Sequence, residues 1–127
     1  MERQLISSGS PFEHSGGYSR AVAVDQWVFV SATSGYDYAN MTIDEDVVEQ
    51  TRQTLRNIEA ALKQAGASLP DVVHVRIFVA EADHWPSISA VFAAVFREIR
   101  PALTATVGGM IVPRIKLEIE AIARRSS

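Results

Sequence analysis

Two short segments near the start of the chain are built largely from apolar residues. Residues 21–24 have the sequence Ala-Val-Ala-Val, and residues 27–32 have the sequence Trp-Val-Phe-Val-Ser-Ala. Asp25 and Gln26 between them are typical of a tight turn, so the pattern predicts a β-hairpin. The residues that follow, 33–41, contain glycine, tyrosine, aspartate and asparagine, and they predict a loop.

Helical spacing appears next along the chain. Residues 42–45, Thr-Ile-Asp-Glu, have the form of a capping box that opens a helix, with acidic residues at its positive end. The apolar stripe that follows consists of Val48, Leu55, Ile58 and Leu62. Gly66 stands where a glycine commonly ends a helix, just beyond its last turn. We therefore expect a first long helix between residues 42 and 66.

After this helix the pattern alternates again, which predicts a strand over residues 71–80. One face of the strand is wholly apolar and consists of Val73, Val75, Ile77 and Val79. The other face is only partly polar and consists of Val72, His74, Arg76 and Phe78. This second face would leave Val72 and Phe78 exposed unless something covers them.

A second helix and two final strands complete the predicted elements. The helix begins near Trp85-Pro86, with proline in an early position, and Pro101 prevents it from continuing. Residues 103–107 and 115–122 predict the two strands, which are joined through Gly108-Gly109.

The resulting order, β-β-β-α-β-α-β-β, predicts an α+β fold with two helices packed on one face of a single mixed sheet. The hairpin supplies two of the three strands before the first helix, and the third is not assigned to particular residues. A length of 127 residues predicts one domain, residues 1–127. The other face of such a sheet stays open, and association with further copies of the chain is the simplest way to cover it.

Composition and charge exclude several classes of protein. The formal charge is −3 with no cluster of lysine and arginine, so no nucleic-acid partner is predicted. No stretch approaches the roughly 20 apolar residues of a membrane span. The first residues, Met-Glu-Arg-Gln, lack the apolar run of a secretory signal, so a cytoplasmic location is expected. The absence of cysteine excludes disulfides, thiolate nucleophiles and cysteine-based metal sites.

Other common constellations are also missing. Neither a metal nor any other cofactor is predicted, because ligand spacing is absent among the three histidines, His14, His74 and His84. Ser31 and Asp37 lack the Gly-x-Ser-x-Gly turn of a hydrolase nucleophile. Glu118 and Glu120 share a strand face, but the partner elements of a sugar-cleaving cleft are absent.

Five pieces of the chain form an ordered set: Tyr18-Ser19-Arg20-Ala21, Val28-Phe29-Val30-Ser31, residues 50–67, Arg100-Pro101-Ala102-Leu103 and Leu117-Glu118-Ile119-Glu120-Ala121. Together they resemble the Rid family of small enamine and imine deaminases, over roughly residues 16–123. The resemblance implies a chorismate mutase-like fold and a homotrimer. It also implies small-molecule pockets at the subunit interfaces, each built from two chains.

The resemblance assigns roles to particular residues. Glu118 matches the glutamate that positions or activates the attacking water, which makes it the candidate catalytic residue. Tyr18 and Ser31 match residues that shape the substrate pocket. Four further pocket positions differ from the family pattern: Ala32 replaces a common glycine, Ser89 an asparagine, Leu103 an arginine and Ala105 a cysteine found in some members. The loop over residues 33–41 also differs from the usual segment.

The change at Leu103 bears directly on substrate binding. The arginine of the family suits a substrate carboxylate because it binds it bidentately, and losing such a contact costs on the order of ~2–5 kcal/mol. We expect Leu103 to lie beside Glu118, where it would raise the pKa of the carboxyl by desolvation and favour a neutral or differently oriented ligand. Arg20 and Arg114 are the candidates for a substitute cation.

Three functions are compatible with this pattern. The first is hydrolysis of the C=N bond of a small imine or enamine, or of a related carbonyl compound, with altered specificity. The alternative from another class is a non-catalytic trimer that binds a small metabolite or regulates. A weaker alternative is endoribonuclease activity, since the chain is acidic and has no basic aromatic stripe. A cation directed at Glu118 would favour the first function, and an apolar pocket would favour the second.

Overall fold

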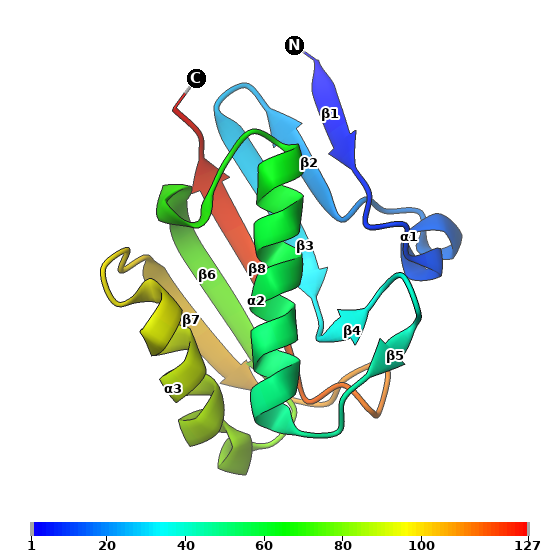
Figure 1. Cartoon of the computed structure of the whole chain (residues 1–127), viewed down its shortest axis with the longest axis vertical. Coiled ribbons are helices and arrows are strands. Elements are labelled where there is room, and N and C mark those ends of the chain that lie inside the picture. The colour runs from blue at the N-terminus through cyan, green and yellow to red at the C-terminus, as the bar shows by residue number, and fades with distance from the viewer. Residues whose placement is uncertain (1, 127) are drawn as a thin grey trace.

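The computed structural model describes residues 2–126 of the chain. Six strands form one mixed sheet in the order β1-β2-β3-β8-β6-β7 (Figure 1). Their bounds are Arg3–Ile6 (β1), Ala21–Val24 (β2), Trp27–Thr33 (β3), Val72–Val79 (β6), Ala102–Val107 (β7) and Leu117–Arg124 (β8). Strands β6 and β7 are parallel, and the other neighbouring pairs are antiparallel.

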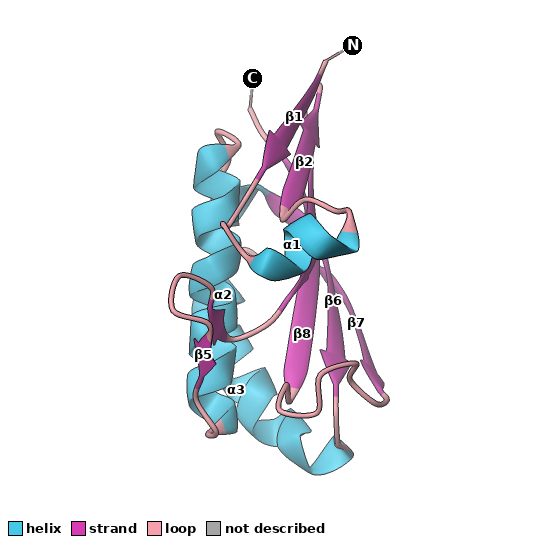
Figure 2. Ribbon diagram, turned by 90° about the vertical axis from the view of Figure 1, so that its right-hand side faces the viewer, coloured by secondary structure: helices cyan, strands magenta, loops and turns pink. Residues whose placement is uncertain are grey.

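Two helices cover one face of this sheet. Helix α2 spans Val47–Gln64 and α3 spans Trp85–Phe96, and Figure 2 shows both on the same side of the strands. Helix α3 forms the crossover between the parallel strands, which need such a connection. The main core lies between these helices and the buried side chains of β3, β6 and β8. The predicted α+β fold and the order β-β-β-α-β-α-β-β of the main sheet and long helices are confirmed.

Several short elements are not predicted by the sequence pattern. They are β1, α1 (Pro11–Gly16), β4 (Tyr36–Asp37), β5 (Thr42–Ile43) and 3₁₀ turns at Leu69–Asp71 and Ala82–His84. Strand β1 is the unassigned third strand of the prediction, and it pairs with β2. Strands β4 and β5 form a separate two-stranded sheet. The prediction of a loop over residues 33–41 is therefore wrong at Thr33, which ends β3, and at Tyr36–Asp37, which form β4, whereas residues 34–35 and 38–41 lie outside helices and strands.

Helix α2 begins later than the sequence predicts. Strand β5 takes up the first two of residues 42–45, so these residues do not form a capping box. Asp46 is the N-cap, and its Oδ2 accepts a hydrogen bond at 3.0 Å from the backbone N–H three residues further on. Packing of Ile43 in a small cluster with Tyr36 accounts for the extended chain before the helix. The predicted end is confirmed, because Gly66 follows the helix with φ of +76°.

A bulge changes the predicted faces of β6. The register against β8 shifts between Val72 and His74, and as a result Val72 is 3% exposed while Val73 is 46% exposed. The prediction that Val73 lies on the core face and Val72 on the open face is therefore wrong. From Val75 onward the strand alternates as predicted, and Phe78 is partly exposed on the uncovered face.

The face of the sheet away from α2 and α3 is uncovered in the single chain. Its exposed apolar side chains include Leu5 of β1 and Trp27 and Phe29 of β3. Strand β7 lies at the edge of the sheet, and all of its residues are exposed. None of the helices within residues 2–126 combines the length and apolar character needed to traverse a membrane. In the single chain, the sheet thus exposes apolar side chains on one face and the unpaired edge of β7 at one side.

Gly35, between β3 and β4, packs directly against α2. A Cβ at this position would lie 2.5 Å from the carbonyl oxygen of Gln50 and 2.8 Å from its Cα. Gly35→Ala is therefore expected to lower the free energy of unfolding by about 1–3 kcal/mol, the usual cost of overpacking. Thermal unfolding followed by circular dichroism measures this, with Gly108→Ala as the control because a Cβ there meets nothing within 4 Å. Equal midpoints for the two variants would contradict this close approach.

Candidate functional site

The second half of β3 contains a β-bulge. The register against β8 shifts between Val30 and Thr33, so β3 has one residue more than β8 over this stretch. The bulged stretch includes Ser31 and Ala32, and both are partly exposed. Bulges re-aim side chains and are common beside active sites. Two residues expected in the pocket therefore lie where the strand departs from regular geometry.

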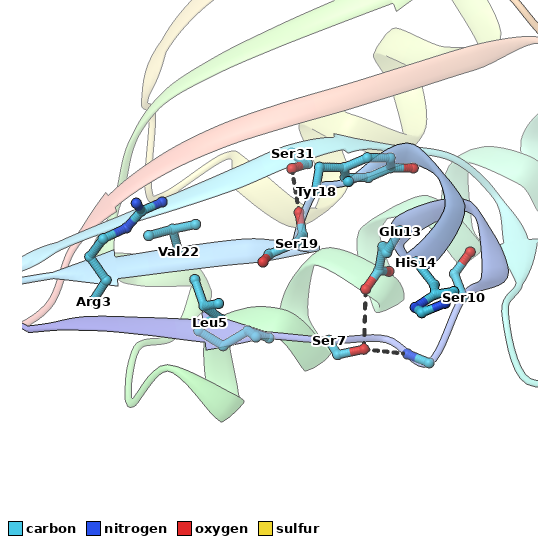
Figure 3. A pocket seen from close by; sticks show the side chains of 13 residues that line it. Arg3, Leu5, Ser7, Ser10, Glu13, His14, Tyr18, Ser19, Val22 and Ser31 are labelled. Carbon is cyan, nitrogen blue, oxygen red and sulfur yellow. Dashed lines mark hydrogen bonds between the residues drawn. The ribbon is translucent and has the colours of Figure 1, made fainter.

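The segment that leads into β2 holds this bulge in place. The backbone N–H of Ser31 donates to the carbonyl oxygen of Arg20 at 2.9 Å. Its Oγ donates to the carbonyl oxygen of Ser19 at 2.7 Å (Figure 3). Thr33 Oγ1 donates in turn to the carbonyl oxygen of Ser31 at 2.7 Å. Tyr18 begins this segment, so the structure brings the predicted pocket residues Tyr18 and Ser31 to one place.

Tyr18 and Ser31 line a depression of about 920 Å³ (Figure 3). Leu5 and Val22 line it from β1 and β2, and Glu13 lines it from α1. Their place on the strands puts the depression on the uncovered face of the sheet. It is wide and open, whereas small-molecule sites bury most of the ligand surface. A further surface is needed to enclose a ligand here.

Glu118 lies on β8 opposite Phe78 of β6, on the same uncovered face. Burial raises the pKa of Glu118, and the positive charge of Arg20 partly offsets this by lowering it. The neighbouring Glu120 differs, since it accepts a hydrogen bond at 2.8 Å from Arg76 in a pair at the surface. A carboxylate with a raised pKa and no ion-pair partner within residues 2–126 is the better candidate for proton transfer. Of the two glutamates, that is Glu118.

The two candidate cations lie in different surroundings. Nη2 of Arg114 donates to the carbonyl oxygen of Ile43 at 3.4 Å, and the Arg114 carbonyl oxygen accepts from Gln50 Nε2 at 3.1 Å. Within one chain these bonds hold Arg114 against β5, and Arg114 is not among the groups that shift the pKa of Glu118. Arg20 is buried, and its positive charge lowers the pKa of Glu118.

The remaining predicted pocket residues lie on the other side of the sheet. Strand β7 pairs with β6 so that Leu103 stands beside Val75, a core residue that faces the helices. Ala105 lies two residues further along the same face, and Ser89 lies on α3. The expectation that Leu103 lies beside Glu118 and desolvates it is therefore wrong for a single chain. In the single chain, Glu118 is partly buried by residues of the uncovered face, where Phe78 is its neighbour on β6.

Comparison with known proteins places the chain among relatives. Residues 9–125 match the family model described as Endoribonuclease L-PSP, the model of the YjgF/Rid family. The chain belongs to the Rid family. A RutC family protein of Pyrococcus abyssi is 31% identical over 97% of this chain and 98% of its own length. The 2-iminobutanoate/2-iminopropanoate deaminase of Capra hircus is 32% identical, over 97% of this chain and 90% of its own length.

Solved structures of Rid-family proteins agree with the fold. Rv2704 of Mycobacterium tuberculosis, described as a member of the YjgF/YER057c/UK114 family, matches with a TM-score of 0.88 at 42% sequence identity. The match covers 97% of this chain and 99% of that one. The α+β architecture described above is therefore the architecture of a Rid-family protein.

This Rid-family chain also has site residues that the sequence analysis does not single out. Glu13 on α1 forms an ion pair with Arg20, and Thr33 accepts a hydrogen bond from the same arginine. A sequence signal for Glu13 exists, because Ser10-Pro11-Phe12-Glu13 has the form of a capping box with proline at the first helical position. No local pattern indicates that Glu13 meets Arg20.

Proposed function

We propose that this chain hydrolyses a reactive imine or enamine, or a related carbonyl compound, in pockets between the subunits of a homotrimer. The observation that carries the proposal is Glu118, a partly buried carboxylate on the strand that pairs with the bulged part of β3. Its pKa is raised by burial, which suits a group that must take up and release a proton. The imine deaminase among the relatives supports the same chemistry.

A homotrimer is supported by the way the predicted pocket residues are divided. Ser31 and Glu118 lie on the uncovered face, while Leu103 and Ala105 lie toward the helix side of the edge strand β7. The sheet itself separates these halves within one chain. The exposed edge of one copy can meet the uncovered face of the next, and three such head-to-tail contacts close a ring. Each contact would complete one pocket and cover apolar surface.

In the proposed reaction, water attacks the carbon of the C=N bond while Glu118 accepts a proton from that water. The new C–O bond forms as the π electrons move to nitrogen, which takes up that proton from Glu118. The resulting carbinolamine loses ammonia, and its oxygen becomes the carbonyl oxygen of the product, a 2-oxo acid when the substrate is a 2-imino acid. Tyr18 and Ser31 would border the substrate, and no cofactor is needed for this proton chemistry.

Leu103 is the basis for proposing altered specificity. It is 44% exposed on the edge strand, where the resemblance implies an arginine that binds a carboxylate. An apolar side chain there favours a substrate without a carboxylate, or one bound in another orientation. The same feature supports a second candidate, a trimer that binds a small metabolite without turnover. Endoribonuclease activity, which the family description names, is less compatible with a net charge of −3.

The test is an assay of imine hydrolysis with freshly generated 2-iminopropanoate and 2-iminobutanoate. Wild type is expected to turn these acids over slowly, and Leu103→Arg is expected to raise kcat/KM on the order of 10²-fold by supplying a carboxylate contact. Val107→Arg is the matched control, because it adds the same charge at another exposed position of the same strand face. Sedimentation velocity measures whether the chain forms a trimer.

Two results would contradict the proposal. If neither wild type nor Leu103→Arg hydrolyses any imine, including a neutral one, then hydrolysis fails and metabolite binding without turnover becomes the leading account. If Val107→Arg raises kcat/KM as much as Leu103→Arg does, then residue 103 does not face the substrate.

A further inference from the structure

Arg20 is among the most deeply buried large side chains of the protein, with 2% of its surface exposed. Its Nε donates to Glu13 at 3.2 Å in an ion pair, and Glu13 is itself 5% exposed. Its Nη1 donates to the carbonyl oxygen of Ala32 at 2.9 Å and to Thr33 Oγ1 at 3.1 Å. The guanidinium carbon lies 4.8 Å from the ring centre of Tyr38. A single buried cation thus binds both α1 and the bulge of β3.

Glu13 is equally well held. Its Oε1 accepts hydrogen bonds at 3.2 Å from Ser7 Oγ and from the backbone N–H of Ser8, and its Oε2 accepts one from Ser8 Oγ. Both oxygens of this buried carboxylate thus have hydrogen-bond partners, as a buried charged group requires. The pair therefore keeps both charges inside the protein, close to the depression that Glu13 and Tyr18 line.

The pair lies next to the strand that carries Glu118. Thr33, which accepts from Arg20, pairs with Ile119 of β8, the residue that follows Glu118. The guanidinium is also 5.7 Å from the ring centre of Tyr18. Arg20 is thus in contact with the bulge and near Tyr18, and its charge acts on Glu118 without pairing with it.

We propose that the Arg20–Glu13 pair positions the reaction centre, fixing the bulge that carries Ser31 and Ala32 and holding a buried cation next to the strand that carries Glu118. The role is that of a positioning pair, because both side chains are almost fully buried and act through the bulge of β3 and on Glu118. The kinetic consequences of this inference rest on the proposed hydrolysis. Its effect on the titration of Glu118 does not, and can be measured without turnover. Removing the charge of Arg20 and removing the charge of Glu13 should therefore displace the pH at which Glu118 titrates, in opposite directions.

Other charged or titratable groups occur on the elements around Glu118. They are Lys116, Glu120 and Arg124 on or just before β8, His74 and Arg76 on β6, and Tyr18, Arg20 and Glu13 near the start of β2 and on α1. Strands β3 and β7 carry none. Arg76 is paired with Glu120, and Lys116 Nζ donates to the backbone of Glu45. Among these groups, Arg20 is the one whose charge lowers the pKa of Glu118, and Glu13 bears on that charge through its ion pair with Arg20.

The experiment compares Arg20→Gln, Glu13→Gln and Arg20→Lys with wild type. The titration of Glu118 is followed by the side-chain carboxyl ¹³C signal of glutamate-labelled protein, assigned with Glu118→Gln. Arg20→Gln removes a cation, so the Glu118 titration should move to higher pH. Glu13→Gln removes the compensating anion, so it should move to lower pH. Arg20→Lys keeps the charge and should restore the titration close to that of wild type.

A matched control separates this effect from a general loss of charge. Arg52→Gln removes one arginine from the exposed surface of α2, and it should leave the Glu118 titration in place because the charge of Arg52 does not act on Glu118. With 2-iminopropanoate as substrate, the acid limb of the kcat/KM profile should move in the same directions as the ¹³C titrations. A purely structural role for the pair would lower stability without producing opposite displacements.

The outcomes distinguish this inference from the proposed function. If Arg20→Gln and Glu13→Gln displace the titration in the same direction, or not at all, the positioning role is wrong even if the enzyme is active. If the displacements are opposite but no imine is hydrolysed, the pair acts on Glu118 and the proposed reaction is wrong. Should Arg20→Gln fail to fold, Glu13→Gln still decides, because an unchanged or alkaline displacement would overturn the inference.

Discussion

Replacing Glu118 with glutamine is expected to lower kcat/KM for imine hydrolysis by about 10²- to 10⁴-fold, the usual contribution of a positioned acid–base group. Glutamine keeps the shape of the side chain but cannot accept the proton of the attacking water. Steady-state kinetics with the best imine substrate measures the loss. Glu120→Gln is the control, since Glu120 is engaged with Arg76 at the surface. Comparable losses in both variants would mean that the role assigned to Glu118 is wrong.

The same variant is expected to separate activity from stability. Burial raises the pKa of Glu118 in the folded protein, so the folded state holds this proton more tightly than the unfolded chain does. The resulting stabilisation is complete below the pH at which an unfolded glutamate titrates, and it is lost as the pH rises through the raised pKa. Glutamine does not titrate. As pH rises from the unfolded to the raised folded pKa, wild type loses this stabilisation and Glu118→Gln does not. The free energy of unfolding of Glu118→Gln should therefore increase relative to that of wild type over this pH range, and urea unfolding at several pH values measures the difference.

Arg20→Leu is expected to lower the free energy of unfolding by about 3–5 kcal/mol, because it leaves the carboxylate of Glu13 buried without its partner. Both side chains of the pair are almost completely buried, so solvent does little to weaken their interaction. Urea denaturation measures the loss. The double variant Arg20→Leu/Glu13→Leu should recover part of it, because a buried pair replaced by apolar residues no longer contains an unpaired charge.

An exposed pair on α2 supplies the control for this prediction. Arg52 and Glu49 form an ion pair at the surface, three residues apart on the helix. Arg52→Leu is expected to change stability by no more than about 1 kcal/mol, as is typical of exposed pairs. If Arg20→Leu costs no more than this control, the Arg20–Glu13 pair does not have the energetic role that its burial indicates.

The sequence pattern was sufficient for the main sheet and its long helices, but not for the short elements. The hairpin of β2 and β3 and most of strand β6 carry a clear apolar pattern, and a proline marks the start of α3. Strand β1 carries little of such a pattern, because three of its four residues are exposed. Strands β4 and β5 have only two residues each, which is too short for any period. The start of α2 is misplaced because burial of Ile43 keeps residues 42–43 extended in β5, so that Asp46 becomes the N-cap.

The sequence pattern predicts the parts of the candidate site that depend on local pairing, and not those that depend on long-range register. Tyr18 and Ser31 flank a short hairpin, so local pairing brings them together. The bulge of β3 leaves no mark in the alternation of its residues, yet it determines where Ser31 and Ala32 lie. The position of Leu103 depends on the parallel pairing of β7 with β6, which is set by the crossover through α3 and not by local sequence. The order of apolar and polar residues along the chain does not predict register between strands that are distant in the sequence.

The place of β8 in the sheet has a consequence for how the protein forms during translation. Strand β8 lies between β3 and β6, although it is synthesised after both. Until it has left the ribosome, the strands made before it belong to two groups, β1 to β3 and β6 with β7, which the completed sheet joins only through β8. Each group then presents an unpaired edge and uncovered apolar side chains, which are the features that promote misassembly between chains. Translation pauses before β8 would prolong that exposure, and a holding chaperone would act on the two groups during this interval.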